Sequence, residues 1–312
     1  MNIPMPLKVV FMGTPDFAVP ALKILNDSSH IIQAVVTAPD KPQGRGRHEQ
    51  PSAVKSAAID FGLPILQPEK LRSPEFLNVL KELSPDVIVV VAFKILPDAV
   101  FTLPKFGSFN LHASLLPKYR GAAPIHWALL NGDKETGVTT FFLKSTVDTG
   151  NIIKQVKTPI YPEDNLHTLY SRLCHMGADL VLETTNLIAS GAVIAGEQDN
   201  SQTSPAPKVT SETRLLNFQE TAEQCHNRVR AFAPAPGAFT YRDGSLLKVL
   251  LTRKIEKQGT PGEIIQISDN SFTVACAGGA LEIFSLQPES KKVMDAASYL
   301  RGYPLKKGEH LG

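Results

Sequence analysis

Short runs of apolar residues, many of them β-branched, recur through the first two hundred residues of the chain. Each run has the length of a single strand, and a continuous apolar character is typical of strands that are buried on both faces of a sheet. Between the runs, apolar residues are spaced three or four apart. The predicted strands are residues 7–12, 31–36, 86–93, 108–111 and 138–143.

Helices are predicted between these strands. Ser73 and Pro74 offer an N-cap and a first-turn proline, and Gly132 is placed to end a helix. One later stretch keeps its three- and four-residue spacing long enough to form an extended amphipathic helix. The predicted helices are residues 17–25, 76–83, 125–130 and 165–191.

Alternating strands and helices indicate βαβ units, which assemble into a doubly wound, largely parallel sheet of the α/β class. Ligands bind such sheets beyond the carboxyl ends of the strands, where the strand order reverses. We therefore expect the functional residues at strand ends and in the loops that follow them.

The pattern changes after Gly196. A polar stretch with Pro205 and Pro207 is typical of a linker, and short strands separated by turn residues follow a single helix. We predict a small β-barrel of the oligonucleotide-binding type in this part. The predicted helix is 222–232, and the predicted strands are 246–251, 262–268, 271–276 and 280–286. The predicted domains are 1–196 and 212–312, joined by a linker over 197–211.

Composition limits the class of protein. With 312 residues, 43% of them hydrophobic, the chain can bury more than one core, in agreement with two domains. Its longest apolar stretch, residues 87–93, is too short to cross a bilayer, and the start of the chain lacks the features of a signal peptide. We therefore expect a cytoplasmic protein that does not enter a membrane.

Other features of the composition say less about function. The three cysteines form no CxxC pair, so neither a zinc site nor a disulfide framework is indicated. The formal net charge of +2 argues neither for nor against a nucleic-acid partner.

The residues with the clearest chemical potential are Asn110 and His112, at the end of one predicted strand. Side chains two residues apart on a strand project from the same face, so these two can meet one substrate atom together. An amide and an imidazole can both donate hydrogen bonds to a carbonyl oxygen that becomes negatively charged. Asp148, which we place at the end of the next strand, could fix the protonation state of the imidazole or accept a proton from an attacking amine.

The segment that continues from these residues, Ser114-Leu115-Leu116-Pro117, is followed by an Arg-Gly pair and by an Asp-x-Gly that begins at Asp148. The whole series resembles the formyltransferases that use 10-formyltetrahydrofolate. The resemblance implies a Rossmann-like catalytic domain, a catalytic trio of Asn110, His112 and Asp148, and a folate pocket without a metal ion. It places the following residues against the folate: Phe93, Leu96, Ser114, Leu115, Leu116 and Pro117.

Two further segments resemble the methionyl-tRNA formyltransferase family more closely. Residues 11–18 look like that family's first strand and loop, which lack the GxGxxG of dinucleotide-binding proteins. Residues 37–47 are similar to a basic loop that enters the acceptor end of tRNA in the family. The resemblance implies that Lys41, Arg45 and Arg47 bind tRNA.

The resemblance therefore implies transfer of a formyl group from 10-formyltetrahydrofolate to the α-amine of methionyl-initiator tRNA. We assume that the enzyme is a monomer. Formylation of a small amine, such as glycinamide ribonucleotide or an amino-sugar nucleotide, is an alternative with the same chemistry. A non-catalytic RNA-binding module with the fold of an enzyme is an alternative of another class. The additional barrel domain and the basic loop favour the large polyanionic substrate.

Overall fold

The computed structural model describes residues 5–43 and 48–312 of the chain. The chain forms two compact units, each built from several segments. The first unit contains the residues up to Gly121, Thr136–Thr158 and Tyr170–Pro205, and the second contains Ala122–Glu135, Pro159–Leu169 and Ala206–Gly312.

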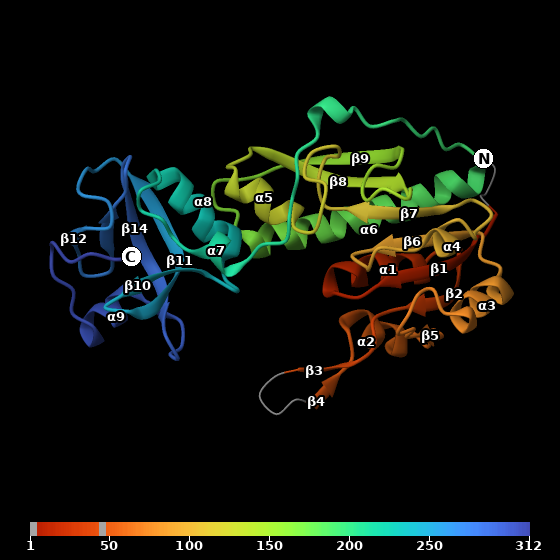
Figure 1. The fold of residues 1–312 in the computed structure, drawn as a ribbon, viewed down its shortest axis with the longest axis horizontal. Coiled ribbons are helices and arrows are strands. Elements are labelled where there is room, and N and C mark those ends of the chain that lie inside the picture. Colours follow the sequence, from red (N-terminus) through yellow and green to blue (C-terminus); the bar gives the residue numbers. More distant parts are fainter. Residues whose placement is uncertain (1–4, 44–47) are drawn as a thin grey trace. The chain divides into compact units, whose positions relative to one another are not determined.

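A seven-stranded sheet runs through the first unit in the order β5-β2-β1-β6-β7-β8-β9 (Figure 1). Its strands are β1 (Lys8–Gly13), β2 (Ile31–Val36), β5 (Ile65–Leu66), β6 (Val87–Val91), β7 (Ser108–His112), β8 (Glu135–Phe142) and β9 (Ile152–Pro159). The pairs from β5 to β7 are parallel, and β8 is antiparallel to β7. From β1 the chain goes to β2 on one side and later to β6 on the other, so the strand order reverses between β1 and β6. The predicted doubly wound, largely parallel sheet is confirmed.

The helices up to Ser190 begin and end close to the predicted residues. Ser73 caps its helix by accepting a hydrogen bond from the Phe76 amide at 3.3 Å, and Gly132 follows the end of another helix with a φ of 70°. The helices are α1 (Val19–Asn26), α2 (Ala53–Asp60), α3 (Pro74–Leu83), α4 (Asp98–Phe101) and α6 (Leu166–Ser190), together with α5 (Pro124–Leu130), which belongs to the second unit. Only the short α2 and α4 were not predicted.

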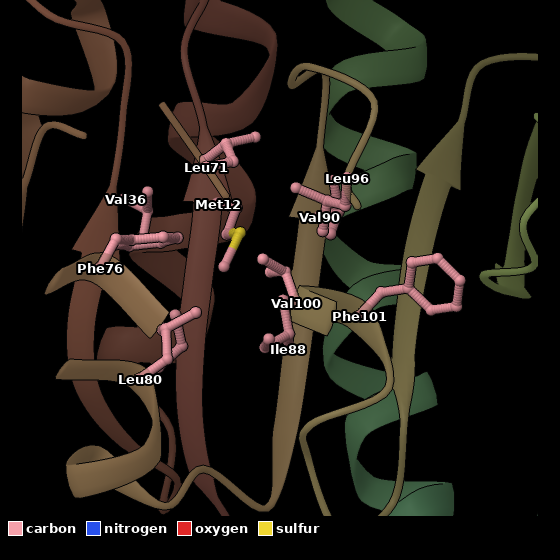
Figure 2. Close-up of a cluster of buried hydrophobic side chains, with 11 residues drawn as sticks. Met12, Val36, Leu71, Phe76, Leu80, Ile88, Val90, Leu96, Val100 and Phe101 are labelled. Atoms are coloured by element: carbon pink, nitrogen blue, oxygen red, sulfur yellow. The ribbon is translucent and has the colours of Figure 1, made fainter. Parts of the chain in front are cut away.

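One face of the sheet buries a cluster of apolar side chains under α3 and α4 (Figure 2). Met12 and Val90 come from the two central strands, and Phe76 and Leu80 from α3 cover them. Burying a side chain of this size contributes roughly 1.5–3 kcal/mol. The rest of the cluster consists of Val10, Val36, Leu71, Ile88, Leu96, Val100 and Phe101. This cluster fixes the strands whose ends carry the site.

The long helix α6 packs against the end of the sheet that β7 and β8 form. A Cβ at Gly177 would lie only 2.6 Å from Leu111, so the glycine allows α6 to approach β7 closely. Thr140 of β8 and Thr184 of α6 share a hydrogen bond of 2.7 Å. Because Leu111 faces α6, its neighbours in the strand, Asn110 and His112, face the opposite side of the sheet.

The second unit is built on an antiparallel sheet in the order β10-β11-β14-β13-β12, with β15 paired to β14. The last residues of the chain reach both edges of this sheet. The Ile264 amide donates to Glu309 at 2.7 Å, and the Gly312 amide donates to Tyr241 at 3.0 Å. The elements are α7 (Ser211–Arg214), α8 (Ala222–Phe232), β10 (Ala238–Arg242), β11 (Ser245–Ile255), β12 (Ile264–Ile267), β13 (Phe272–Ala275), β14 (Ala280–Pro288), β15 (Met294–Asp295) and α9 (Ala296–Gly302).

The predicted antiparallel β domain is therefore confirmed, and α8 has the predicted bounds. Among the described residues the edge strands β10 and β12 are not paired with each other, and the chain terminus links them instead. The stretch predicted as a linker contains a short helix, η2 (Asn200–Gln202). The domain boundaries at 196 and 212 stay a prediction.

Candidate active site

The site begins at the carboxyl end of β7, where two predicted residues lie on one face. Asn110 pairs in register with Val90 of β6, and His112 is the last residue of the strand. The imidazole of His112 is 6% exposed, whereas Asn110 is half-buried. Within the described part of the chain, the Asn110 amide has no hydrogen-bond partner. It is therefore available to a ligand.

The two ring nitrogens of His112 have different surroundings. Nε2 lies 2.8 Å from the main-chain oxygen of Tyr119, and since a carbonyl only accepts, Nε2 carries a proton and donates it. Nδ1 lies 3.9 Å from Oδ2 of Asp148. In the neutral ring Nδ1 is therefore the acceptor, and only the imidazolium can donate a hydrogen bond from that side.

Asp148 does not lie at a strand end, so its predicted location was wrong. β8 ends at Phe142, and Asp148 lies in the loop before β9 with a φ of 54°, a left-handed conformation that is uncommon outside glycine. Its Oδ2 accepts a hydrogen bond from the Gly121 amide at 2.8 Å. The loop turns back tightly at Gly150. Only a glycine fits there, since a Cβ would lie 1.5 Å from the Phe142 oxygen. Tertiary contacts therefore bring the carboxylate beside His112.

The loop that follows β1 lies at the reversal point of the sheet. A Cβ at Gly13 would be 2.8 Å from Ala18 and 3.0 Å from the Val91 oxygen, so the glycine permits close packing onto the end of β6. The Tyr170 hydroxyl of α6 donates to Asp16 at 2.5 Å. Burial, together with this hydrogen bond, raises the pKa of Tyr170, which keeps the hydroxyl protonated as a donor.

The turn from Ser114 to Pro117 is fixed mainly through its own main chain. Ser114 is fully buried, and its hydroxyl donates to Lys118 at 2.6 Å while its carbonyl accepts from Thr139 at 2.6 Å. The Leu116 carbonyl accepts from Gln155 at 2.8 Å. Ser114 and Leu116 are buried, and Leu115 and Pro117 are partly exposed. The turn therefore offers Leu115 and Pro117 to a ligand more readily than Ser114 and Leu116.

Phe93 and Leu96, the other residues predicted to contact folate, lie in the segment between β6 and α4. Leu96 is buried in the apolar cluster, and the partly exposed Phe93 packs against the same cluster. Ile95 between them is 74% exposed, and no sequence pattern had singled it out. An exposed isoleucine beside Phe93 adds apolar surface at the carboxyl edge of the sheet.

The predicted tRNA-binding loop belongs to a hairpin formed by β3 (Lys41–Gln43) and β4 (His48–Gln50). Lys41 is exposed at its start, whereas Arg45 and Arg47 lie outside the described residues. Asp40, just before the hairpin, pairs with Lys55 of α2 at 2.5 Å and accepts a hydrogen bond from Gln67 at 2.9 Å. The hydrogen bond from Lys55 lowers the pKa of the Asp40 carboxyl most, and that from Gln67 lowers it further.

Over residues 5–43 and 48–312, no group of three or more His, Cys, Asp or Glu side chains could hold a metal ion. No helix in the same ranges is long and apolar enough to span a bilayer. The three cysteines are free and buried.

Several contributors to this site carried no signal in the sequence. The Tyr119 carbonyl, the Gly121 amide and the Gln198 side chain reach His112 or the Asp148 loop by hydrogen bonds. Main-chain groups have no residue-type signature, and Gln198 is 50 residues from Asp148 in a stretch predicted to be a linker. Only the folded structure reveals them.

The fold is a doubly wound sheet with an Asn–His–Asp group at its carboxyl edge, and comparison with known families shows to which class of enzyme it belongs. The sequence profile of the family described as formyl transferase matches residues 7–185, and that of the formyl transferase C-terminal domain matches residues 208–304. The chain belongs to the formyl transferase family, and within it to the methionyl-tRNA formyltransferases.

The narrower assignment comes from full-length relatives. Methionyl-tRNA formyltransferase of Citrifermentans bemidjiense is 42% identical over 98% of this chain and 96% of its own length. The enzymes of that name from Pelotomaculum thermopropionicum and Moorella thermoacetica are each 43% identical, over 98% of this chain and 99% of their own. Such similarity across both units shows that the chain is an enzyme of this type.

Solved structures support the fold. The sugar 3N-formyl transferase WlaRD, determined in the presence of dTDP and 5-N-formyl-THF, is 22% identical with a TM-score of 0.67 over 92% of this chain and all of its own. HypX from Aquifex aeolicus in complex with tetrahydrofolic acid is 16% identical with a TM-score of 0.66 over 99% of this chain. This chain covers 51% of HypX.

Proposed function

We propose that Asn110, His112 and Asp148 carry out formyl transfer from 10-formyltetrahydrofolate to the α-amine of methionyl-initiator tRNA. The proposal is supported above all by His112 Nδ1, which faces the Asp148 carboxylate at 3.9 Å, and by the nearby Asn110 amide, which has no hydrogen-bond partner among the described residues. A donor amide and an acid–base pair on one face are what attack of an amine on a formyl carbon needs.

In the reaction, a bond forms between the α-nitrogen and the formyl carbon, and the bond from that carbon to the folate nitrogen then breaks. Asn110 donates a hydrogen bond to the formyl oxygen as negative charge develops on it. His112 joins it as the imidazolium, donating from Nδ1, since Nε2 is already committed to Tyr119. Asp148 accepts the proton that the amine loses, directly or through water, and the proton finally goes to the folate nitrogen.

The residues beside this group suit the folate co-substrate. Its pterin ring is flat and aromatic, and Phe93, Leu115 and Pro117 offer partly exposed apolar surface for it. Small-molecule sites typically combine such an apolar lining with a few fixed polar groups. The residues present therefore fit 10-formyltetrahydrofolate, and no metal ion is required because the formyl group is already activated on the folate nitrogen.

Lys41 and the sequence-predicted Arg45 and Arg47 would bind the acceptor end of tRNA. Three cations within a short stretch of sequence suit contacts with phosphates. That the enzyme acts as a cytoplasmic monomer also stays a prediction from the sequence, and sedimentation of the purified protein tests the monomer.

The test is formylation of three acceptors by the purified enzyme with 10-formyltetrahydrofolate: charged initiator tRNA, glycinamide ribonucleotide and an amino-sugar nucleotide. We expect efficient formylation of the charged tRNA alone. Preference for either small amine would reject the tRNA assignment while keeping the chemistry. Formylation of none, with tRNA still bound, would reject catalysis.

A further inference from the structure

We propose that Gln198 is a positioning residue for formyl transfer, which holds the loop of Asp148 so that its carboxylate faces His112. The inference rests on the proposed catalytic role of Asp148. Gln198 belongs to the polar stretch between α6 and α7, and all contacts that carry the inference lie within the first unit.

The side-chain amide of Gln198 is almost buried, at 8% exposure, and every one of its hydrogen-bonding positions is used. Nε2 donates to the Asp148 carbonyl at 2.9 Å and to the Gly150 carbonyl at 2.8 Å. Oε1 accepts from Nε and Nη2 of Arg120 at 3.0 and 2.6 Å. The guanidinium only donates and the carbonyls only accept, so the amide has a single satisfied orientation.

This amide therefore joins the segment of residues 119–121, which holds His112, to the loop that carries Asp148. Arg120 lies between Tyr119, whose carbonyl holds His112 Nε2, and Gly121, whose amide holds the Asp148 carboxylate. On its other side, Gln198 holds both carbonyls that flank the turn of the Asp148 loop. One buried side chain thus links the two segments that set the geometry between the ring and the carboxylate.

A second contact from the same stretch acts on the same segment. The Ser204 hydroxyl accepts from the Tyr119 amide at 2.9 Å, and the Ser204 carbonyl accepts from the Arg120 amide at 2.9 Å. Gln198 and Ser204 are consequently not parts of a passive connector. Together they fix the main chain at Tyr119, the partner of His112, and the loop that carries Asp148.

A fixing device is needed because the Asp148 conformation is not one that the loop would adopt alone. A φ of 54° in a non-glycine residue costs of the order of 1 kcal/mol and persists only where surrounding contacts impose it. Two hydrogen bonds from one buried amide to the carbonyls at positions 148 and 150 supply such contacts. Without them, we expect the loop to relax and the carboxylate to move away from Nδ1.

The sharpest test is Gln198→Glu, which keeps the shape and the pairing with Arg120 but turns the two donors into an acceptor facing two carbonyls. We expect kcat to fall roughly 10- to 100-fold, because displacement of a reacting group by about 1 Å costs this much. The KM values for 10-formyltetrahydrofolate and methionyl-tRNA should stay within about twofold, since the buried Gln198 offers almost no surface to a substrate. A merely structural role would change both substrates' KM values or the folded fraction instead.

Gln202→Glu is the matched control. Gln202 lies in the same stretch and is exposed. Within the described ranges its side chain bonds to Asp199 alone, at 2.9 Å, so we expect wild-type kcat. Circular dichroism and thermal unfolding check that both variants fold. If Gln198→Glu does not fold, Gln198→Met removes the donors without adding charge and is measured in its place.

The connection with Asp148 is tested in the double variant. If Gln198 acts through Asp148, adding Gln198→Glu to Asp148→Asn should lower the residual rate by less than about twofold, because groups that act as a unit are not additive. Multiplicative losses would overturn the inference about Gln198 and leave the proposed function standing. A normal kcat in folded Gln198→Glu, when Asp148→Asn is inactive, would do the same. A nearly normal rate in Asp148→Asn itself would instead reject the proposed function of Asp148.

Discussion

The Nε2 atom of His112 donates to the main-chain oxygen of Tyr119 at 2.8 Å, and this one bond decides which ring nitrogen stays available to a ligand. Because a peptide carbonyl cannot be removed by substitution and does not titrate, the tautomer is set by the fold. Nδ1 is left to face Oδ2 of Asp148 at 3.9 Å, so the ring needs no reorientation to present this nitrogen to the carboxylate.

Replacing Asp148 with Asn should lower kcat by roughly 10²- to 10⁴-fold, because the amide keeps the size of the side chain but cannot accept the proton of the amine. Binding of folate and tRNA should be nearly unchanged. Steady-state kinetics with each substrate varied in turn measure both quantities. Near-normal turnover in the folded variant would remove Asp148 from the reaction.

His112→Ala and Asn110→Ala should each reduce the chemical rate by roughly 10²- to 10³-fold, the usual loss for an oxyanion donor. The double variant should lose less than the product of the two, since both groups act on one oxygen. Single-turnover measurements with preformed enzyme–substrate complex give the rates. Strictly multiplicative losses would assign the two side chains to separate steps.

Arg45→Ala tests the predicted path of tRNA, with Arg45 lying outside the described residues. If Arg45 binds a phosphate, the salt dependence of tRNA affinity should flatten by a little under one unit of slope, since one fewer counterion is released. If it selects the initiator, discrimination against elongator methionyl-tRNA should fall. Values of kcat/KM for both tRNAs at two salt concentrations separate these roles, and unchanged values would withdraw the assignment.

His226 makes the stability of the protein depend on pH. Burial, together with nearby Arg230 and Lys254, lowers the pKa of His226 to about 4 from an ordinary value of 6.5. The folded state therefore keeps this ring neutral where the unfolded chain protonates it. The contribution is complete above pH 6.5 and is lost as the pH falls toward 4, by at most about 3 kcal/mol.

His226→Gln should accordingly unfold in urea with a shallower loss of stability between pH 7 and pH 4 than the parent protein. His175→Gln, at an exposed position, controls for the loss of a histidine. Identical pH dependence in His226→Gln and the parent would show that another group is responsible.

Gly150→Ala should destabilise the protein by more than about 2 kcal/mol and abolish most activity, because its Cβ would fall 1.5 Å from the Phe142 oxygen and displace the Asp148 loop. Gly196→Ala is the control, since a Cβ there meets nothing within 4 Å, and it should change stability by less than about 0.5 kcal/mol. Urea unfolding and formylation assays measure the effects. A Gly150→Ala protein as active as Gly196→Ala would show that the loop need not pass so close to β8.

The sequence by itself determined the elements whose signals are local. Continuous apolar runs and three-to-four spacing, together with caps such as Ser73, predicted β2, α3, α6 and α8 nearly to the residue. The two-residue repeat of a strand placed Asn110 and His112 on one face of β7. Strands with weaker patterns were missed, such as β9, whose residues are mostly only partly buried and carry several polar side chains.

Only the tertiary structure decided how these parts become a site. Asp148 reaches His112 because its loop is held by the Gly121 amide, 27 residues away, and by Gln198, 50 residues away. The tautomer of His112 depends on the Tyr119 carbonyl, and main-chain groups are the same in every residue type. Long-range hydrogen bonds of this kind leave no periodicity in the sequence, because they depend on which segments packing brings together and not on the spacing of residues along the chain.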